Sequence, residues 1–410
     1  MAETESRHNG QAAHAFPVYL KVILILSDGI RGHINQSRGI AHWLSVLTGA
    51  EVLEINVPKL SAAARARVKS TSKSLRNSTM RDARDWLASA DGDDLVRVVG
   101  NLLGERGITA NSGKLLIISA GSAAAPYNLA LAYVWRCACA TVMTPSVIGT
   151  APFDYAIVPE HDFPKRDSNI LVTLGAPNNI LKENLKCEAE TLLAKFPPKA
   201  KNKWSVLIGG DDANYTITPQ WLKKHLGQIL NLAARSEADV YITTSRRTKK
   251  DAEKTVKTLA SHSNAVRYLL IASEDDFNPI PAMLGFSDTV FCTDDSVNMV
   301  SETITGGHRA VLMRTERKGS IRKAAQSIVA TLVNAGAMSK NMLWGIPKFD
   351  LIFDHFAREG RLIEYESWLR AARANLYSES ALQKHESVVY GDFNEAKRAA
   401  EWICANWRQR

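Results

Sequence analysis

The sequence predicts an α/β protein with two domains, each built on a parallel sheet. Short apolar runs, typical of strands buried on both faces, alternate with helical patterns along most of the 410 residues. The alternation restarts after residues 196–203 (FPPKAKNK), whose prolines and lysines are typical of a linker. Strand–loop–helix units on both sides of a linker indicate two separate parallel sheets.

The first half opens with a complete βαβ unit. An apolar strand at 19–26 runs into a polar loop at 27–36, a helix from about 37 to 47 and a second strand at 52–57. A long helical region follows at 60–112, with its cations near the start. Further short strands are expected at 114–119, 141–143, 155–159 and 171–174.

The second half repeats this alternation of strand, loop and helix. Residues 290–313 show it best, because an apolar run reaches a polar corner, a helical pattern follows, Gly306-Gly307 stops it, and another apolar run closes the unit. Its other strands are expected at 204–208, 240–243 and 266–271. The expected domains are a disordered lead-in at 1–17, an N-terminal acceptor domain at 18–200, a C-terminal donor domain at 201–348, and a helical tail at 349–410 that packs back on the first domain.

Charge and cysteine content narrow the class of partner and the compartment. The net charge is +9 and the isoelectric point about 9.2, which suits an anionic ligand or surface. The cations are scattered and carry no nucleic-acid-binding signature, so we expect no nucleic acid partner. Five cysteines without CxxC pairing indicate reduced thiols in a cytoplasmic protein. No metal-ligand spacing is present, so we expect neither a metal nor another cofactor.

Polar residues gather at the predicted carboxyl ends of the second-domain strands, where open parallel sheets bind ligands. Glycines let a backbone approach phosphate, arginines neutralise it, and a helix N-terminus with a hydroxyl completes a cradle. Glu302 could hold a ribose. The predicted nucleotide-sugar site comprises Gly209, Gly210, Thr244, Ser245, Arg246, Arg247, Asp295, Ser296, Asn298 and Glu302. The alternative is that Asp294, Asp295 and Ser296 only cap the helix and that the arginines form a solvated face.

The first-domain loop GIRGHINQ has a different character. Its glycines allow a tight turn that would leave Asp28 and His33 at the site, where either could be the general base. His33 could equally be a helix residue bonded to backbone. Glu160 is a second acid–base candidate. Three more residues of the same loop are assigned to nucleotide-sugar binding: Gly32, Asn35 and Gln36. Neither a Walker A loop nor GxSxG is present, which disfavours P-loop phosphoryl transfer and serine hydrolysis.

Successive motifs along residues 22–315 resemble those of the elongated-mitochondria (mitochondrial fission) protein family, in the family's order. They read SDGIRGHINQSRGIA, IVPEHD, NILVTLGAPN, VLIGGDD, YITTSRRT and CTDDSVNMVSE. The resemblance implies a GT-B arrangement, with two Rossmann-like domains facing a central cleft. Within that group, GIRGH resembles the glycine-rich loop of the transferase that adds N-acetylglucosamine in peptidoglycan synthesis. SVNMVSE resembles the donor-binding helix, whose glutamate would be Glu302. The chain is most similar to bacterial-type members.

These expectations combine into a metal-independent glycosyltransferase that moves a sugar from a nucleotide-sugar donor to a cell-envelope glycan or lipid-linked acceptor. Inversion and retention both stay open. One alternative is a non-catalytic peripheral-membrane or scaffold protein, which the basic helices at 60–80 and the tryptophans of the tail favour. Another is a nucleotide-sugar epimerase using His33 and Glu160. The expected place is the cytoplasm, with contact to the inner face of the membrane under the peripheral alternative.

Overall fold

The computed structural model describes residues 19–318, 321–339, 342, 346–375 and 392–407. The lead-in expected at 1–17 lies outside them. The chain forms two compact units, one of Met1–Ala156 with Lys397–Arg410 and one of Ile157–Ala396. The domain boundary at residue 200 and the separate tail remain predictions. Helix α14 (Glu395–Ala405) falls largely within the first unit.

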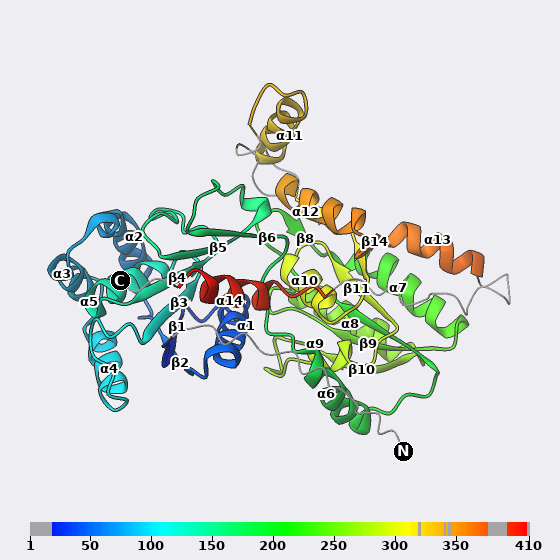
Figure 1. The fold of residues 1–410 in the computed structure, drawn as a ribbon. Coiled ribbons are helices and arrows are strands. Elements are labelled where there is room, and N and C mark those ends of the chain that lie inside the picture. The colour runs from blue at the N-terminus through cyan, green and yellow to red at the C-terminus, as the bar shows by residue number, and fades with distance from the viewer. Residues whose placement is uncertain (1–18, 319–320, 340–341, 343–345, 376–391, 408–410) are drawn as a thin grey trace, which may run out of the picture. The chain divides into compact units, whose positions relative to one another are not determined.

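The first sheet has the strand order β2-β1-β3-β4-β5-β6 (Figure 1). Strands β1 and β3 are buried along their whole length, as their unbroken apolar runs predict. Parallel pairing joins β1 to β2 and β3, and β3 to β4. The strand bounds are β1 Val22–Ser27, β2 Glu51–Asn56, β3 Leu115–Ala120, β4 Ala138–Val142, β5 Tyr155–Pro159 and β6 Ile170–Thr173.

Helices follow these strands as the apolar periodicity predicts. The region expected to be helical at 60–112 contains three α-helices and a 3-10 turn, and α3 begins with a capping box formed by Thr79 and Asp82. The helices are α1 Arg31–Thr48, α2 Ala62–Thr71, α3 Met80–Ser89, α4 Asp93–Gly104, α5 Ala125–Trp135 and α6 Lys182–Lys195. Helix α1 starts six residues earlier than the sequence pattern predicts.

The second sheet has the order β10-β9-β7-β11-β12-β14, and its neighbouring strands pair in parallel. Counted along this unit, the order is 3-2-1-4-5-6, that of dinucleotide-binding Rossmann sheets. The predicted class, α/β with two Rossmann-like parallel sheets, is confirmed. The strands are β7 Asn202–Leu207, β9 Ala238–Thr243, β10 Val266–Leu270, β11 Thr289–Thr293, β12 Ala310–Met313 and β14 Leu362–Glu364.

The helices of the second unit pack around this sheet, and a small antiparallel pair, β8 (Tyr215–Thr216) with β13 (Glu316–Arg317), lies beside it. The helices are α7 Pro219–Arg235, α8 Lys250–Ser261, α9 Ile280–Leu284, α10 Val297–Thr305, α11 Ile321–Asn334, α12 Ile346–Arg358 and α13 Tyr365–Asn375. Helix α10 ends at the predicted glycine pair, where Gly307 has a φ of 94°.

The tryptophans of the tail are half-buried and pack against other aromatic rings. Trp368 meets Trp204 edge to face with ring centroids 5.4 Å apart in the second unit. In the first unit Trp407 stacks on Tyr155 at 6.2 Å, and Trp402 meets the same ring edge to face. These half-buried rings are engaged with aromatic side chains of the protein, so they give little support to a membrane-binding tail.

Candidate functional site

The candidate site lies where the strand order of the second sheet reverses, between β7 and β11. Connections leave such a switch point in opposite directions, and the loops at the carboxyl ends leave room for a ligand. Three loops meet there: the one after β7 contains Gly209 and Gly210, the one after β9 contains Arg247, and the one after β11 contains Asp295. Direct bonds join all three.

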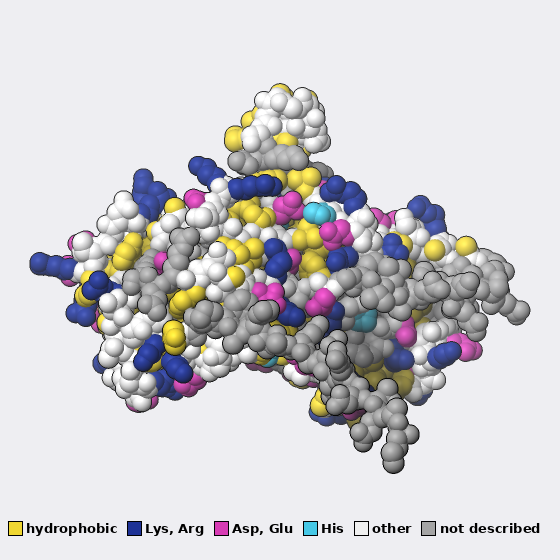
Figure 2. Space-filling model, in the orientation of Figure 1, with side chains coloured by type: hydrophobic (Ala, Val, Ile, Leu, Met, Phe, Trp, Pro, Cys, Tyr) yellow, Lys and Arg dark blue, Asp and Glu magenta, His cyan; other side chains and the backbone are white. Residues whose placement is uncertain are grey.

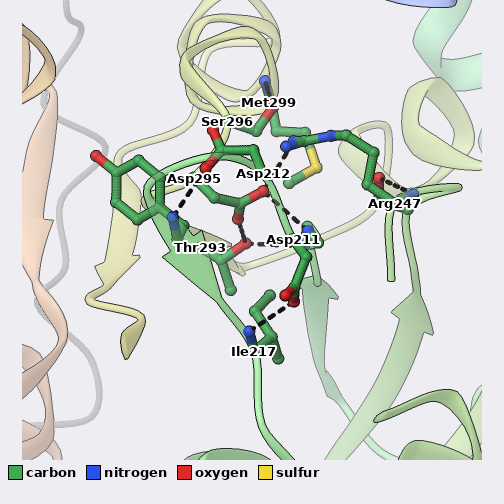
Figure 3. A network of polar contacts seen from close by, with 12 residues as sticks. Asp211, Asp212, Ile217, Arg247, Thr293, Asp295, Ser296 and Met299 are labelled. Carbon is green, nitrogen blue, oxygen red and sulfur yellow. Dashed lines mark hydrogen bonds and ion pairs between the residues drawn. The ribbon is translucent and has the colours of Figure 1, made fainter. Parts of the chain in front are cut away.

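The carboxylate of Asp295 is the centre of these bonds (Figure 3). Its side chain is fully buried, and Oδ2 accepts from the Gly210 N–H at 2.9 Å and from the Arg247 guanidinium at 2.8 Å. Oδ1 accepts from the Thr293 hydroxyl at 2.6 Å, whose oxygen in turn accepts from the Gly209 N–H at 2.8 Å. A buried carboxylate group therefore holds the three loops together.

The glycine pair makes room for these contacts rather than for an open phosphate cradle. A Cβ added at Gly209 would collide with the Asp295 carboxylate, and one at Gly210 would collide with the backbone of Arg247. Both glycine N–H groups already donate to side chains of the β11 loop. The expectation that Gly209 and Gly210 let the backbone approach a diphosphate therefore stays a prediction, with both N–H groups bonded inside the protein here.

The two adjacent arginines are held differently. Arg246 pairs with the exposed carboxylate of Asp276, whereas Arg247 pairs with the buried Asp295 while 42% of its own side chain stays exposed. One guanidinium nitrogen of Arg247 donates to Asp295, and a guanidinium carries five N–H donors in all. Asp295 thus fixes the direction of Arg247 at the switch point.

The neighbouring hydroxyls of the β9 loop form hydrogen bonds within the protein. Thr244 accepts the N–H of Ala272 at 3.0 Å, and Ser245 accepts that of Arg247 at 3.2 Å. Thr248 donates to the Gly209 carbonyl at 2.6 Å and accepts from the Ser245 N–H. Thr248 and Thr293 are not among the predicted site residues. Their only signal was their place directly beside predicted site residues.

Two adjacent buried carboxyl groups at the site have raised pKa values. Burial raises the pKa of Asp295, and the bonds from Arg247, Thr293 and Gly210 offset this only in part. Burial also raises the pKa of Asp294, whose Oδ1 accepts from the Thr315 hydroxyl at 2.6 Å and N–H at 2.9 Å. Neither aspartate caps α10, so the capping alternative fails for both.

Helix α10 begins at this point with a conventional cap. Ser296 is the N-cap, and its hydroxyl accepts the Met299 N–H at 3.4 Å, as the capping alternative predicted for this residue. Asn298 lies in the first turn and is partly exposed. Glu302 is 6% exposed, on the helix that leads away from the switch point.

The β7 loop continues with two aspartates that close a turn. Although burial alone would raise the pKa of Asp211, bonds from Lys249, the Ile217 N–H, Thr216 and Lys318 lower it to about 2. Asp212 Oδ1 accepts the N–H groups of residues 214 and 215 at 2.6 and 2.8 Å. Both aspartates accept backbone N–H groups at residues 214–217, and so they hold the turn that leads into β8.

In the first unit, Asp28 and His33 form a hydrogen-bonded pair. His33 Nδ1 lies 2.8 Å from Asp28 Oδ2, and the Asp28 side chain is 4% exposed while that of His33 is 24% exposed. Asp28 Oδ1 also accepts the Ile30 N–H at 3.0 Å. The His33 ring covers Gly121, whose φ of 81° and lack of a Cβ permit this approach.

The loop expected at 27–36 is mostly helix. Because Gly29 turns the chain at a φ of 80°, α1 begins at Arg31 and places Gly32, His33, Asn35 and Gln36 within its first turns. Gln36 is buried. The prediction of a loop here is corrected, while the proximity of Asp28 and His33 that it implied is present.

The third catalytic candidate, Glu160, belongs to the second unit. It begins a 3-10 turn directly after β5, and its Oε2 lies 3.0 Å from Nδ1 of His355 on α12. The next residue, His161, packs edge to face on Phe349, and burial lowers its pKa. Glu160 is therefore one half of an exposed carboxylate–histidine pair.

Two solved structures are similar to this chain. A UDP-GlcNAc 2-epimerase from Neisseria meningitidis bound to UDP-GlcNAc is 12% identical, with a TM-score of 0.47 over 94% of this chain and 100% of that one. The glycosyltransferase SnogD from Streptomyces nogalater is 14% identical, with a TM-score of 0.45 over 94% and 100%. Identities this low say nothing about the reaction.

The sequence comparisons identify the family of the chain but not an activity. No curated protein matches the chain at a significant level. No helix within the described ranges is both long and apolar enough to cross a membrane. The family model described as "Mitochondrial fission ELM1" matches residues 31–407, which is most of the chain. The chain therefore belongs to the mitochondrial fission ELM1 family.

Proposed function

We propose that this protein is a metal-independent glycosyltransferase that transfers a sugar from a nucleotide-sugar donor to a cell-envelope glycan or lipid-linked acceptor. The observation that carries the proposal is the switch point of the second sheet. There the loops after β7, β9 and β11 are bonded into one rigid unit around Asp295, directly before the N-terminus of α10. Rossmann sheets bind nucleotides at this position.

The donor diphosphate would bind between Arg247 and the start of α10. The half-exposed guanidinium of Arg247 keeps donors beyond the one given to Asp295, and the helix dipole favours negative charge beside Ser296. Asp295 acts here as a positioning residue, because it touches Arg247 rather than substrate. Glu302 would accept from the ribose hydroxyls. Fixed donors of this kind stabilise the leaving diphosphate without a metal.

The acceptor proton would pass to His33. With Nδ1 bonded to Asp28, the ring is oriented so that Nε2 is the nitrogen left to act as general base. The acceptor oxygen then bonds to the anomeric carbon as the carbon–oxygen bond to the diphosphate breaks. Replacing His33 by Asn should lower the transfer rate by about 10²-fold or more while donor binding is unchanged.

One observation favours a non-catalytic alternative. The carboxylate of Asp295 takes the Gly210 N–H, and the Thr293 hydroxyl takes the Gly209 N–H, so the chain's own side chains occupy donors that a diphosphate could have used. A scaffold protein that kept the fold without binding nucleotide would show this arrangement as well.

A thermal-shift screen of the full chain separates the two. UDP, GDP, CMP, ADP and their common sugar conjugates are tested against the wild type, Arg247→Lys and Glu302→Gln, with Glu188→Gln on the exposed face of α6 as control. Binding to the native state raises the melting temperature by mass action. We expect a rise with one nucleotide that both site variants lose and the control keeps.

The outcomes are distinct. No rise with any nucleotide, from protein that melts cooperatively, would support the scaffold alternative. A rise that survives both site variants would move the donor site away from the switch point. Conversion of the sugar nucleotide without any acceptor would indicate an epimerase.

A further inference from the structure

Helix α11 has its apolar side turned outward. Gln326, a polar residue, is 5% exposed and lies 3.5 Å from the side-chain oxygen of Asn214. Ile328 and Leu332, one helical turn apart, are 62% and 39% exposed. A helix on the surface of a globular protein normally shows the reverse pattern, with its polar side in water.

The exposed stripe continues along the helix. Ala325 is exposed at i−3 from Ile328, and the exposed residues beside the stripe, Ser327 and Thr331, are uncharged. Figure 1 shows α11 projecting beyond the other helices of the second unit, and Figure 2 shows hydrophobic side chains and no charged one on its visible face. Such a stripe needs a partner, since single exposed apolar residues are ordinary but a helical stripe of them is not.

The surrounding sequence indicates what that partner is. Residues 317–349 contain no Asp or Glu, and they contain six cations. Three of them pair with carboxylates of the second unit: Arg317 with Asp350, Lys318 with Asp211 and Lys348 with Asp162. The other three are Arg322, Lys323 and Lys340. An uncharged helical stretch bracketed by cations is the composition of helices that lie in the interface of an anionic bilayer, with apolar side chains among the acyl chains and cations at the headgroups.

Two other partners fit less well. In a symmetric dimer through this face, each patch would meet its own copy, which would bring cations against cations. As a spanning segment α11 is too short, because its 14 residues rise only roughly 21 Å against the roughly 30 Å of a hydrocarbon core. We therefore propose that α11 docks this protein on an anionic membrane surface, in the plane of the interface, through the stripe of Ile328 and Leu332.

This proposal is independent of sugar transfer. It also differs from the expectation that the basic helices at 60–80 and the tail provide the membrane contact, because the tail tryptophans pack against aromatic rings of the protein. In a transferase with a lipid-linked acceptor, the same docking would bring the enzyme to the surface that holds its substrate.

Vesicle flotation of the full chain tests the proposal. Vesicles of phosphatidylcholine alone are compared with vesicles of phosphatidylcholine and phosphatidylglycerol in equal parts. We expect binding to the anionic vesicles only, weakened about tenfold or more by Ile328→Ser/Leu332→Ser, and about tenfold by Arg322→Gln/Lys323→Gln. Added salt should weaken the wild type as well.

Matched control variants carry the same kinds of substitution at other surface positions. Val46→Ser/Val98→Ser changes two apolar side chains that are 60% and 38% exposed on α1 and α4, and Lys223→Gln/Lys224→Gln removes two adjacent exposed cations from α7. Both controls should float like the wild type. Failure of the wild type to bind, or equal loss in the controls, would overturn the proposal. So would an apolar variant that converts a dimer to a monomer without changing flotation. Nucleotide binding, measured by thermal shift, should be unchanged in every variant.

Discussion

Replacing Arg247 by alanine should destabilise this protein far more than the same change at Arg246. Arg247 faces a carboxylate whose side chain is fully buried, whereas the partner of Arg246, Asp276, is 89% exposed. Without Arg247, the Asp295 anion keeps its bonds from the Gly210 N–H and the Thr293 hydroxyl but loses its charged partner at 2.8 Å. Water can take the place of the lost arginine only at Asp276.

The magnitudes follow from this difference in burial. A hydrogen bond to a charged group contributes about 1.5–3 kcal/mol, and the 42% exposure of the Arg247 side chain argues for the lower part of that range. We expect a loss of about 2 kcal/mol in the free energy of unfolding for Arg247→Ala and about 0.5 kcal/mol or less for Arg246→Ala. Urea unfolding followed by tryptophan fluorescence measures both.

The loss at Arg247 should also depend on pH. Burial raises the folded-state pKa of Asp295 above the unfolded value of about 3.9. Below that value both states are protonated and the arginine has no anion to neutralise. Above that value the unfolded state ionises first, so stability falls with pH until the folded-state pKa is reached; removing Arg247 raises the folded-state pKa and extends the fall. Equal effects of the two substitutions, or an Arg247→Ala loss that is constant with pH, would refute this reasoning.

Four further substitutions, at three glycines and at Asp211, give separate predictions. Gly210→Ala forces a Cβ into the backbone of Arg247 and should cost about 3 kcal/mol or more in urea unfolding, whereas Gly227→Ala, at an open position in α7, should be neutral or stabilise by about 0.5–1 kcal/mol. Asp211→Asn should cost about 2 kcal/mol at pH 7, and this loss should vanish as the pH falls through the lowered pKa of about 2, seen in the pH dependence of melting. Gly121→Ala, whose Cβ would lie 2.5 Å from the His33 ring, should abolish sugar transfer but leave the nucleotide-induced thermal shift intact.

The strands and most helices could be predicted because buried parallel strands and amphipathic helices leave local patterns. The start of α1 could not, since it depends on Gly29 turning the chain so that Ile30 leads directly into the helix, and on the Asp28 carboxylate accepting the Ile30 N–H. The polar composition of GIRGHINQ resembles a loop, and helix propensity is weak evidence beside such a tertiary and capping context.

The site could be predicted as a collection of loops but not as a set of contacts. Strand order places Gly210, Arg247 and Asp295 at one edge, because each follows a strand that the apolar pattern predicts. That Asp295 would fill the space above the glycines, 85 residues away in the chain, depends on how the loops close on one another. Glycines that admit a phosphate and glycines that admit a carboxylate look the same in sequence.

Hydrogen–deuterium exchange with and without the nucleotide that gives the largest thermal shift tests most directly whether the switch point is the donor site. If it is, residues 296–302 at the start of α10 and residues 245–248 after β9 become protected on binding, and Arg247→Lys removes that protection. Protection confined to other segments, or exchange at both of these that nucleotide leaves unchanged, would contradict the account.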